Sequence, residues 1–459
     1  MGGRIWAIAV NTFRQVLRTK IALVFMGLLA VSLPLMAATA TGDGTLKGRL
    51  QTFVSYGISL TGFLLSILTI SVSVYTLSSD IEKRQLYTVL TKPLRRFELI
   101  LGKLAGVLLV NLMLLLVFCT LIYAAAVYMP KYTDAPMAQR ATAYTEFLTA
   151  RTSVVPPKPD VSSEVRKTFQ RLKQDNRISD EIENNLQSRE AFLAKLARQI
   201  TLSKRAVAPG RDIVWQFDDI GQIKENDTLF IRFKYDVSVN PPDLQVYSEW
   251  TIGDDRKPPD QLDTPVYYTE RKDSIRTFHE LEVPADAVAE DGYLTVRFKN
   301  PSQANNTLVI YPLGEGLELL YKADNFTRNY VRACLLVFFR LFFLAVLGIL
   351  AASFLSMPVA VLLSLAILLI AHISRFGLES FESLARGYGT LYEYTFVPLV
   401  KLMPQFDKFS PVEYLVQARL ISWSFVSEAA FSMVAVKSLI LLVLCIWIFN
   451  KREIARITI

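Results

Sequence analysis

Long apolar runs alternate with polar stretches along the chain, and their lengths predict most of its architecture. Six runs have roughly the length of about twenty residues that an α-helix needs to cross a bilayer, so we expect six transmembrane helices. The predicted spans are residues 21–40, 52–79, 104–129, 331–354, 357–373 and 431–450. Ahead of them, residues 5–20 carry apolar side chains at helical spacing and end in basic residues, which predicts an interfacial helix. A signal peptide is the alternative for this start, but the apolar run is too long for one.

One polar insertion, residues 130–327, divides the chain into membrane segments 1–129 and 328–459. Its first part, residues 135–208, has helical periodicity and predicts a helical hairpin or a short coiled-coil stalk. Residues 211–315 then alternate with a period of two between Pro, Gly and Asn turns, which predicts strands. We therefore expect an α-helical membrane protein with an inserted α+β domain, whose strands form an antiparallel β-sandwich of jelly-roll type.

The net charge of +8 is unevenly distributed. Residues 130–327 hold 26 Lys and Arg against 31 Asp and Glu, a net of −5, so the remainder holds 24 against 11, a net of +13. Because basic residues concentrate in cytoplasmic loops, this bias predicts a multi-pass protein of the plasma (inner) membrane with both termini in the cytoplasm and the insertion outside. The basic residues do not form an aromatic-interleaved patch, so nucleic acid is not an expected partner.

A charged connector, DIEKRQLYTVLTKPLRRFELILGK, joins the second and third predicted spans at residues 80–103. Six basic residues stand there against three acidic ones, as expected of a loop retained in the cytoplasm. Pro93 ends one short predicted helix, and Arg95 and Arg96 lead into the next. This short, charged loop is the best candidate for a site that a cytoplasmic partner binds.

The connector resembles the E-x-x-x-G-T-x-x-x-L-L-x-x-P-x-S/R-R-x-x-x-x-x-G-K signature of ABC-2 type permeases, especially the branch of nitrous-oxide reductase maturation and gliding motility. The matching positions are Glu82, Leu90, Pro93, Arg95, Arg96, Gly102 and Lys103. Gln85-Leu86 departs from the pattern, which usually has Gly-Thr there. The phrases SFLSMPVA at 353–360 and FNKREIAR at 449–456 resemble the same branch. Residues 375–428, broken by three prolines, resemble the outer re-entrant segment that such permeases carry before their last span.

The resemblance implies that a separate ABC ATPase binds the connector, that ATP and Mg²⁺ are bound by that partner, and that the permease pairs with a second permease, identical or different. The residues expected to couple to the ATPase are Glu82, Arg84, Pro93, Arg95, Arg96, Glu98, Gly102 and Lys103. The sequence itself has no G-x-x-x-x-G-K-[ST] phosphate-binding motif, so we do not expect this chain to be an enzyme.

Other chemistry is sparse in the sequence. His279 with Glu280 and Glu282 is a weak candidate for metal ligands, because positions on one strand share a face only in part and no cysteine joins them. The second histidine, His372, is expected at the outer end of the fifth span, and no convincing Ser-His-Asp or Cys-His arrangement can be built. We therefore expect no catalytic, metal or cofactor site on this chain.

Two cations stand where charge is costly, Arg340 in the fourth predicted span and Lys437 in the sixth. The topology above puts both in the outer half of the membrane, where long side chains can reach the headgroups. In the alternative, both line a transport pathway and hold an anionic group of a lipid or an acidic cargo.

The resemblance favours a permease subunit of an ATP-driven transporter that acts as an exporter. Membrane lipid is an expected partner. The alternative is a mechanical or scaffold protein, in which ATP-driven motion rearranges the external domain and nothing is translocated. That domain has a fold often used to bind proteins or glycans, either of which is then a partner outside the cell.

Overall fold

The computed structural model describes residues 2–82, 95–157, 159–175, 178, 186–218, 220–221, 227–256, 264–313, 316–384 and 404–451. The chain divides into two compact units. The first, called the helical unit here, contains Met1–Ala150 and Asp324–Ile459, and the second, the β unit, contains Arg151–Ala323. The expected insertion began at Pro130, but α5 continues through that proline and the next residues pack with the helices, so the boundary lies at Arg151.

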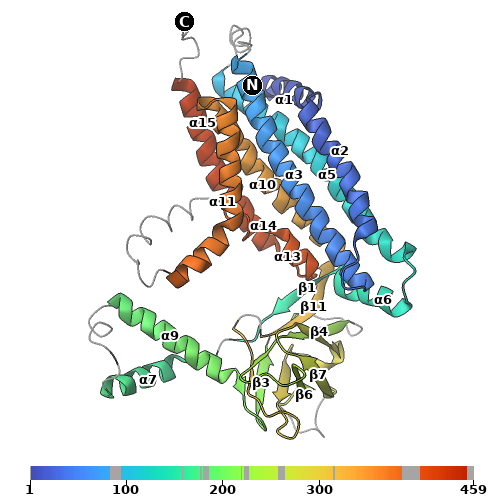
Figure 1. Cartoon of the computed structure of the whole chain (residues 1–459), viewed down its shortest axis with the longest axis vertical. Coiled ribbons are helices and arrows are strands. Elements are labelled where there is room, and N and C mark those ends of the chain that lie inside the picture. The colour runs from blue at the N-terminus through green and yellow to red at the C-terminus, as the bar shows by residue number, and fades with distance from the viewer. Residues whose placement is uncertain are drawn as a thin grey trace. The chain divides into compact units, whose positions relative to one another are not determined.

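Long helices that run side by side build the helical unit (Figure 1). They are α1 (Gly2–Leu17), α2 (Lys20–Thr39), α3 (Leu46–Glu82), α5 (Arg96–Tyr132), α10 (Phe326–Phe354) and α11 (Met357–Leu384), followed by a last rod made of α14 (Trp423–Ala429), the π-helical stretch η4 (Ala430–Ser438) and α15 (Leu439–Lys451). Shorter pieces are α6 (Met137–Thr142), η1 (Ala143–Phe147) and α13 (Pro411–Val416).

Five of the helices in the described residues are long and apolar enough to cross a membrane: α2, α3, α5, α10 and the rod Trp423–Lys451. They coincide with five of the six predicted spans. The remaining prediction falls on α11, whose apolar part, Met357–Ile373, is shorter. A sixth crossing therefore stays a prediction.

Small and hydroxylated residues let the central helices of this unit approach closely. On α3, the hydroxyls of Ser66 and Thr69 are buried and donate to the carbonyls of Gly62 and Leu65, each at 2.6 Å. A side chain at Gly348 of α10 would collide with the Ser73 hydroxyl of α3. Both hydroxyls are bonded within α3, and the Thr69 hydroxyl also lies 3.0 Å from Oδ1 of Asn111 on α5, so these two side chains contribute to helix packing.

Antiparallel sheets build the β unit. Their strands are β1 (Thr149–Val154), β2 (Ala206–Val207), β3 (Asp212–Phe217), β4 (Thr228–Phe233), β5 (Asp236–Val237), β6 (Gln245–Gly253), β7 (Tyr267–Ser274), β8 (His279–Pro284), β9 (Leu294–Lys299), β10 (Val309–Ile310) and β11 (Leu317–Asn325). The strand orders are β1-β11-β4-β8, β2-β10-β5 and β3-β9-β6-β7. The jelly-roll connection stays a prediction.

The inward sides of the three sheets share one core. On β6, Val246, Trp250 and Ile252 are buried while Tyr247 points out, which is the period of two that the sequence shows. The Trp250 ring meets Phe298 of β9 with centroids 5.1 Å apart, directly across the register. Aromatic contacts of this kind add to the stabilisation from area burial.

Two helices complete the β unit, α7 (Ser162–Gln174) and α9 (Leu186–Lys204). They bury Val165 and Phe169 against Leu196. The expected helical region 135–208 is wrong in part, because β1 lies inside it, and β11 lies wholly beyond the expected end of the β-sandwich at 315. Neither strand alternates cleanly in the sequence, since β1 is short and polar and β11 contains a continuous apolar run.

Candidate functional site

The predicted coupling residues gather at one end of the helical unit, which we call the connector end: the end of α3, the start of α5, α1 and the end of α15 (Figure 1). Arg84 and Pro93 of the predicted set lie outside the described residues, as does the stretch 83–94. Glu82 is the last residue of α3 and is exposed, and Arg95 just before α5 is also exposed. These two residues are therefore available to a partner.

Lys103 is buried at the connector end and forms an ion pair that the sequence did not predict. Its Nζ lies 2.5 Å from a carboxylate oxygen of Asp80 and donates to the carbonyl of Thr76 at 2.6 Å. The Lys103 side chain is only 3% exposed. The pair joins α5 to the end of α3, so the expected contact of Lys103 with an ATPase would be indirect.

Glu98 and Arg96 fix the start of α5. The buried Glu98 carboxylate accepts the Arg95 backbone N–H at 3.0 Å, which satisfies a donor that the first turn of a helix leaves without an intrahelical partner. Arg96 donates to the carbonyls of Phe449 and Asn450 at 3.0 and 2.8 Å. Because these carbonyls end the rod of α15, Arg96 ties the last helix to the connector end.

Gly102 and Gly106 let α1 pack closely on α5. A Cβ added at Gly102 would lie 2.6 Å from the Ile8 Cβ, and one at Gly106 would lie 2.6 Å from the Thr12 Cβ. The G-x-x-x-G pattern is thus a packing contact. The predicted interfacial helix α1 is amphipathic, and it packs with Ala9, Thr12 and Val16 buried. Contacts of these residues join α1, α3, α5 and α15 at the connector end.

The second candidate site surrounds Arg340. This residue is the fifteenth of 29 in α10, and Lys437 is the fifteenth of 29 in the rod Trp423–Lys451. Both cations thus lie at mid-helix, and their expected position in the outer half of the membrane stays a prediction. The helices begin before their apolar runs do, at Phe326 and Trp423, and this moves both cations to mid-helix.

The Arg340 side chain occupies a space that Gly62 of α3 leaves open, because a Cβ there would collide with its guanidinium. Its Nη1 lies 3.3 Å from Nε2 of His372 on α11, and its buried Nε has no hydrogen-bond partner within the described residues. Its guanidinium carbon lies 6.0 Å from the centre of the Phe406 ring. Three helices and the segment around Phe406 therefore meet at this cation.

His372 is held in one orientation. Its Nδ1 lies 2.9 Å from the carbonyl oxygen of Leu368, which can only accept, so Nδ1 carries the proton and Nε2 accepts from Arg340. His372 is the sixteenth of 28 residues in α11 and lies next to the end of its apolar part, Met357–Ile373, while the helix itself continues to Leu384.

Part of the predicted re-entrant segment 375–428 packs beside Arg340 and His372. The Phe406 backbone N–H donates to the carbonyl of Ala371, which precedes His372, at 3.2 Å, and the Phe406 ring is buried. Lys408 pairs with Glu428 of α14 at 2.7 Å. Lys437 is half-buried on η4, which packs on α10. Residues 385–403 of the predicted segment lie outside the described residues.

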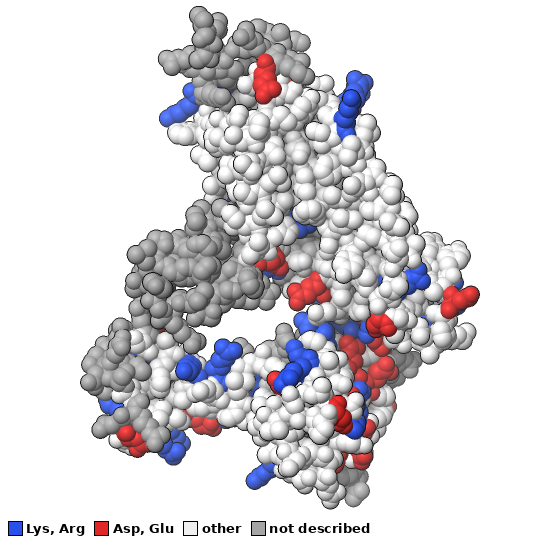
Figure 2. Space-filling model, in the orientation of Figure 1, with Lys and Arg blue, Asp and Glu red and all other residues white. Residues whose placement is uncertain are grey.

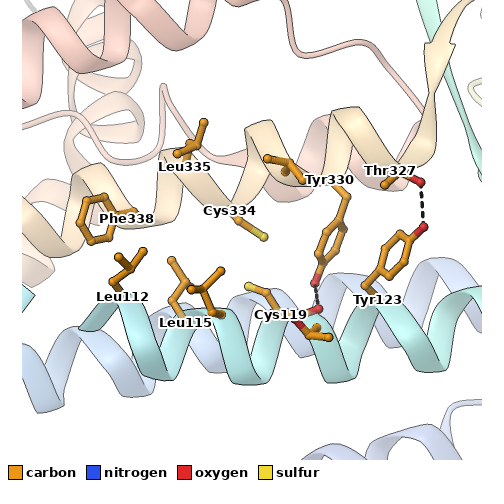
Figure 3. A pocket seen from close by; sticks show the side chains of 12 residues that line it. Leu112, Leu115, Cys119, Tyr123, Thr327, Tyr330, Cys334, Leu335 and Phe338 are labelled. Carbon is orange, nitrogen blue, oxygen red and sulfur yellow. Dashed lines mark hydrogen bonds between the residues drawn. The ribbon is translucent and has the colours of Figure 1, made fainter. Parts of the chain in front are cut away.

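The sequence did not predict the apolar groove of about 240 Å³ between α5 and α10 (Figure 3). Leu112, Leu115 and Phe338 form one part, and Cys119 and Cys334 face each other farther along. Tyr330 donates to the Cys119 carbonyl at 2.9 Å, so the polar groups here are used within the wall. The groove fits apolar chains and offers no group for chemistry.

Known proteins do not place the chain in a family. No protein-family model matches it, and no curated protein matches its sequence. Within the residues that the structure describes, no three His, Cys, Asp or Glu side chains are grouped to hold a metal ion. His279 instead lies 2.8 Å from the Ser274 carbonyl and the Thr277 hydroxyl, as a histidine with a structural role does.

Proposed function

We propose that this chain is the membrane-spanning subunit of an ATP-driven ABC-2 type transporter, an exporter powered by a separate ATPase. The resemblance of residues 80–103 to the permease signature suggests the class. The observation that carries the proposal is the connector end, where Glu82 and Arg95 are exposed beside a stretch whose flanking helices are tied to α1 and α15.

The ties explain how a push at the connector would reach the membrane. Lys103 and Asp80 join α3 to α5, Arg96 joins α5 to α15, and Gly102 joins α5 to α1. Helices linked this way move together when a partner displaces the connector, as rigid elements do in domain closure. ATP-driven closure of the partner would thus reach four helices, in a dimer with a second permease.

The test is the ATPase activity that co-purifies with the chain from its own membranes. We expect Mg²⁺-dependent ATP hydrolysis with the wild-type chain and its loss, by dissociation or uncoupling, in Glu82→Ala. The matched control is Glu190→Ala, an exposed acid on α9 of the β unit. Wild-type amounts of ATPase and wild-type turnover with Glu82→Ala would contradict the assigned role of the connector.

The mechanical alternative differs in one readout. A transporter reconstituted with its ATPase in liposomes should hydrolyse ATP faster when its cargo is present, whereas a mechanical device should not respond to a translocated substrate. The phosphate-binding site that we propose at Arg340 and His372 narrows the class of cargo to test.

A further inference from the structure

We propose that Arg340 and His372 form a binding site inside the membrane for one phosphate oxyanion, carried by a lipid headgroup or by free phosphate. The role of this site in transport rests on the proposed function, whereas its ligand is inferred from the geometry around Arg340.

Arg340 has a different partner from the buried arginine that precedes it on the same helix. Eight residues earlier, Arg332 is buried and its Nη2 lies 2.6 Å from a carboxylate oxygen of Asp324, while its Nη1 donates to the Ile421 carbonyl at 3.2 Å. Arg340 is half-buried and contacts no carboxylate among the described residues; the neutral imidazole of His372 is its hydrogen-bond partner there. A cation within a membrane-spanning helix is costly, so one whose partner in the described part of the chain is neutral points to a ligand.

The surroundings shape the guanidinium for an oxyanion. Gly62 lets the guanidinium pack closely on α3, because a Cβ at that position would collide with Nη2. His372, fixed by the Leu368 carbonyl, holds Nη1, and the buried Nε has no hydrogen-bond partner among the described residues. The planar guanidinium binds phosphate through paired N–H groups, and it does so most strongly where water is excluded.

The test is ligand-dependent thermal stability of the purified full chain in an uncharged detergent. Phosphatidylglycerol, phosphatidylcholine and inorganic phosphate are titrated separately. We expect a rise in Tm that grows with phosphatidylglycerol concentration, as ligand linkage requires, and a half-maximal concentration raised about tenfold or more in Arg340→Leu. The control is Arg328→Leu, a 74% exposed arginine on α10, which should keep the wild-type response.

The titrations with inorganic phosphate and phosphatidylcholine distinguish a lipid headgroup from free phosphate as the source of the oxyanion. An equal rise with inorganic phosphate that Arg340→Leu abolishes assigns the site to free phosphate and keeps the oxyanion proposal. An equal rise with phosphatidylcholine, an unchanged response in Arg340→Leu, or no response to any probe overturns it. A structural Arg340 would also make Arg340→Leu less stable without ligand, as we expect for Arg332→Leu. None of these readouts involves the ATPase, so this proposal can fail while the connector assignment holds.

Discussion

Buried charged side chains have different partners in the two units. In the β unit, Arg151 is buried and makes two hydrogen bonds to Glu280 at 3.0 and 3.1 Å, and the buried Arg232 lies 3.6 Å from Glu318. The helical unit pairs Lys103 in the same manner but leaves Arg340 with an imidazole. On the face shown in Figure 2, charges crowd the β unit and are sparse over the helices. Arg340 thus differs from these three cations, because its hydrogen-bond partner among the described residues carries no charge.

The cores differ as well. Register and aromatic contacts, such as that of Trp250 with Phe298, hold the sheets, whereas close approach at Gly102, Gly106 and Gly348 holds the helices. A glycine contact tolerates no added volume.

The ion pair at the connector end should show the largest effect. Lys103→Met leaves the half-buried Asp80 without its counter-charge and should destabilise the helical unit by about 3–5 kcal/mol. The double variant Lys103→Met with Asp80→Leu should recover most of that loss. Unfolding of the purified chain by denaturing detergent measures both. A single variant as stable as the exposed control Lys322→Met would contradict a buried pair.

The polar network in the core of the β unit comes next. Asn300 is fully buried and donates to the carbonyls of Val207 and Thr307, each at 3.0 Å, and accepts from Asn305. Asn300→Ala leaves these groups unpaired and should cost about 1–3 kcal/mol or more. Loss of the near-ultraviolet circular dichroism on heating reports it. The exposed neighbour Asn306 is the control, and Asn306→Ala should melt as wild type does.

Added volume tests the glycine contacts. Gly106→Leu should force α1 away from α5, because the new side chain would begin 2.6 Å from the Thr12 Cβ, at a cost of about 1–3 kcal/mol. Gly27→Leu on α2 is the matched control, since nothing lies within 4 Å of its added Cβ. We expect faster proteolysis near α1 in the first variant alone. Equal protection of both variants would mean that α1 does not lie on α5.

Alkaline pH should affect the β unit through its buried phenols. Burial raises the pKa of Tyr235 and Tyr311, which stay neutral in the folded unit. Their contribution is fully present below the unfolded pKa near 10 and falls by about 1.4 kcal/mol for each pH unit above it and each phenol. The Tyr311 hydroxyl has no hydrogen-bond partner in the described part of the chain, so Tyr311→Phe should lessen this loss at little cost. A wild-type pH profile in that variant would contradict the assignment.

The sequence predicts what depends on local periodicity and misses what depends on distant partners. Five spans and most strands followed from apolar runs and alternation, because burial on one face repeats along one segment. The partner of Lys103 lies 23 residues away on another helix, and no local pattern names it. The mid-helix position of Arg340 did not follow from the sequence, because α10 begins before its apolar run does. The space at Gly62 appears only when α3 and α10 pack together.

The proposed function requires that the connector faces the cytoplasm and that the β unit faces outside, because an ATPase can bind the connector only from the cytoplasm. Single cysteines at Lys83 and Ser162, with Cys119, Cys334 and Cys445 replaced, test it with a membrane-impermeant thiol reagent. In right-side-out cell preparations the account predicts labelling at Ser162, with labelling at Lys83 only in inverted membranes. Labelling of both positions from the same side would contradict it.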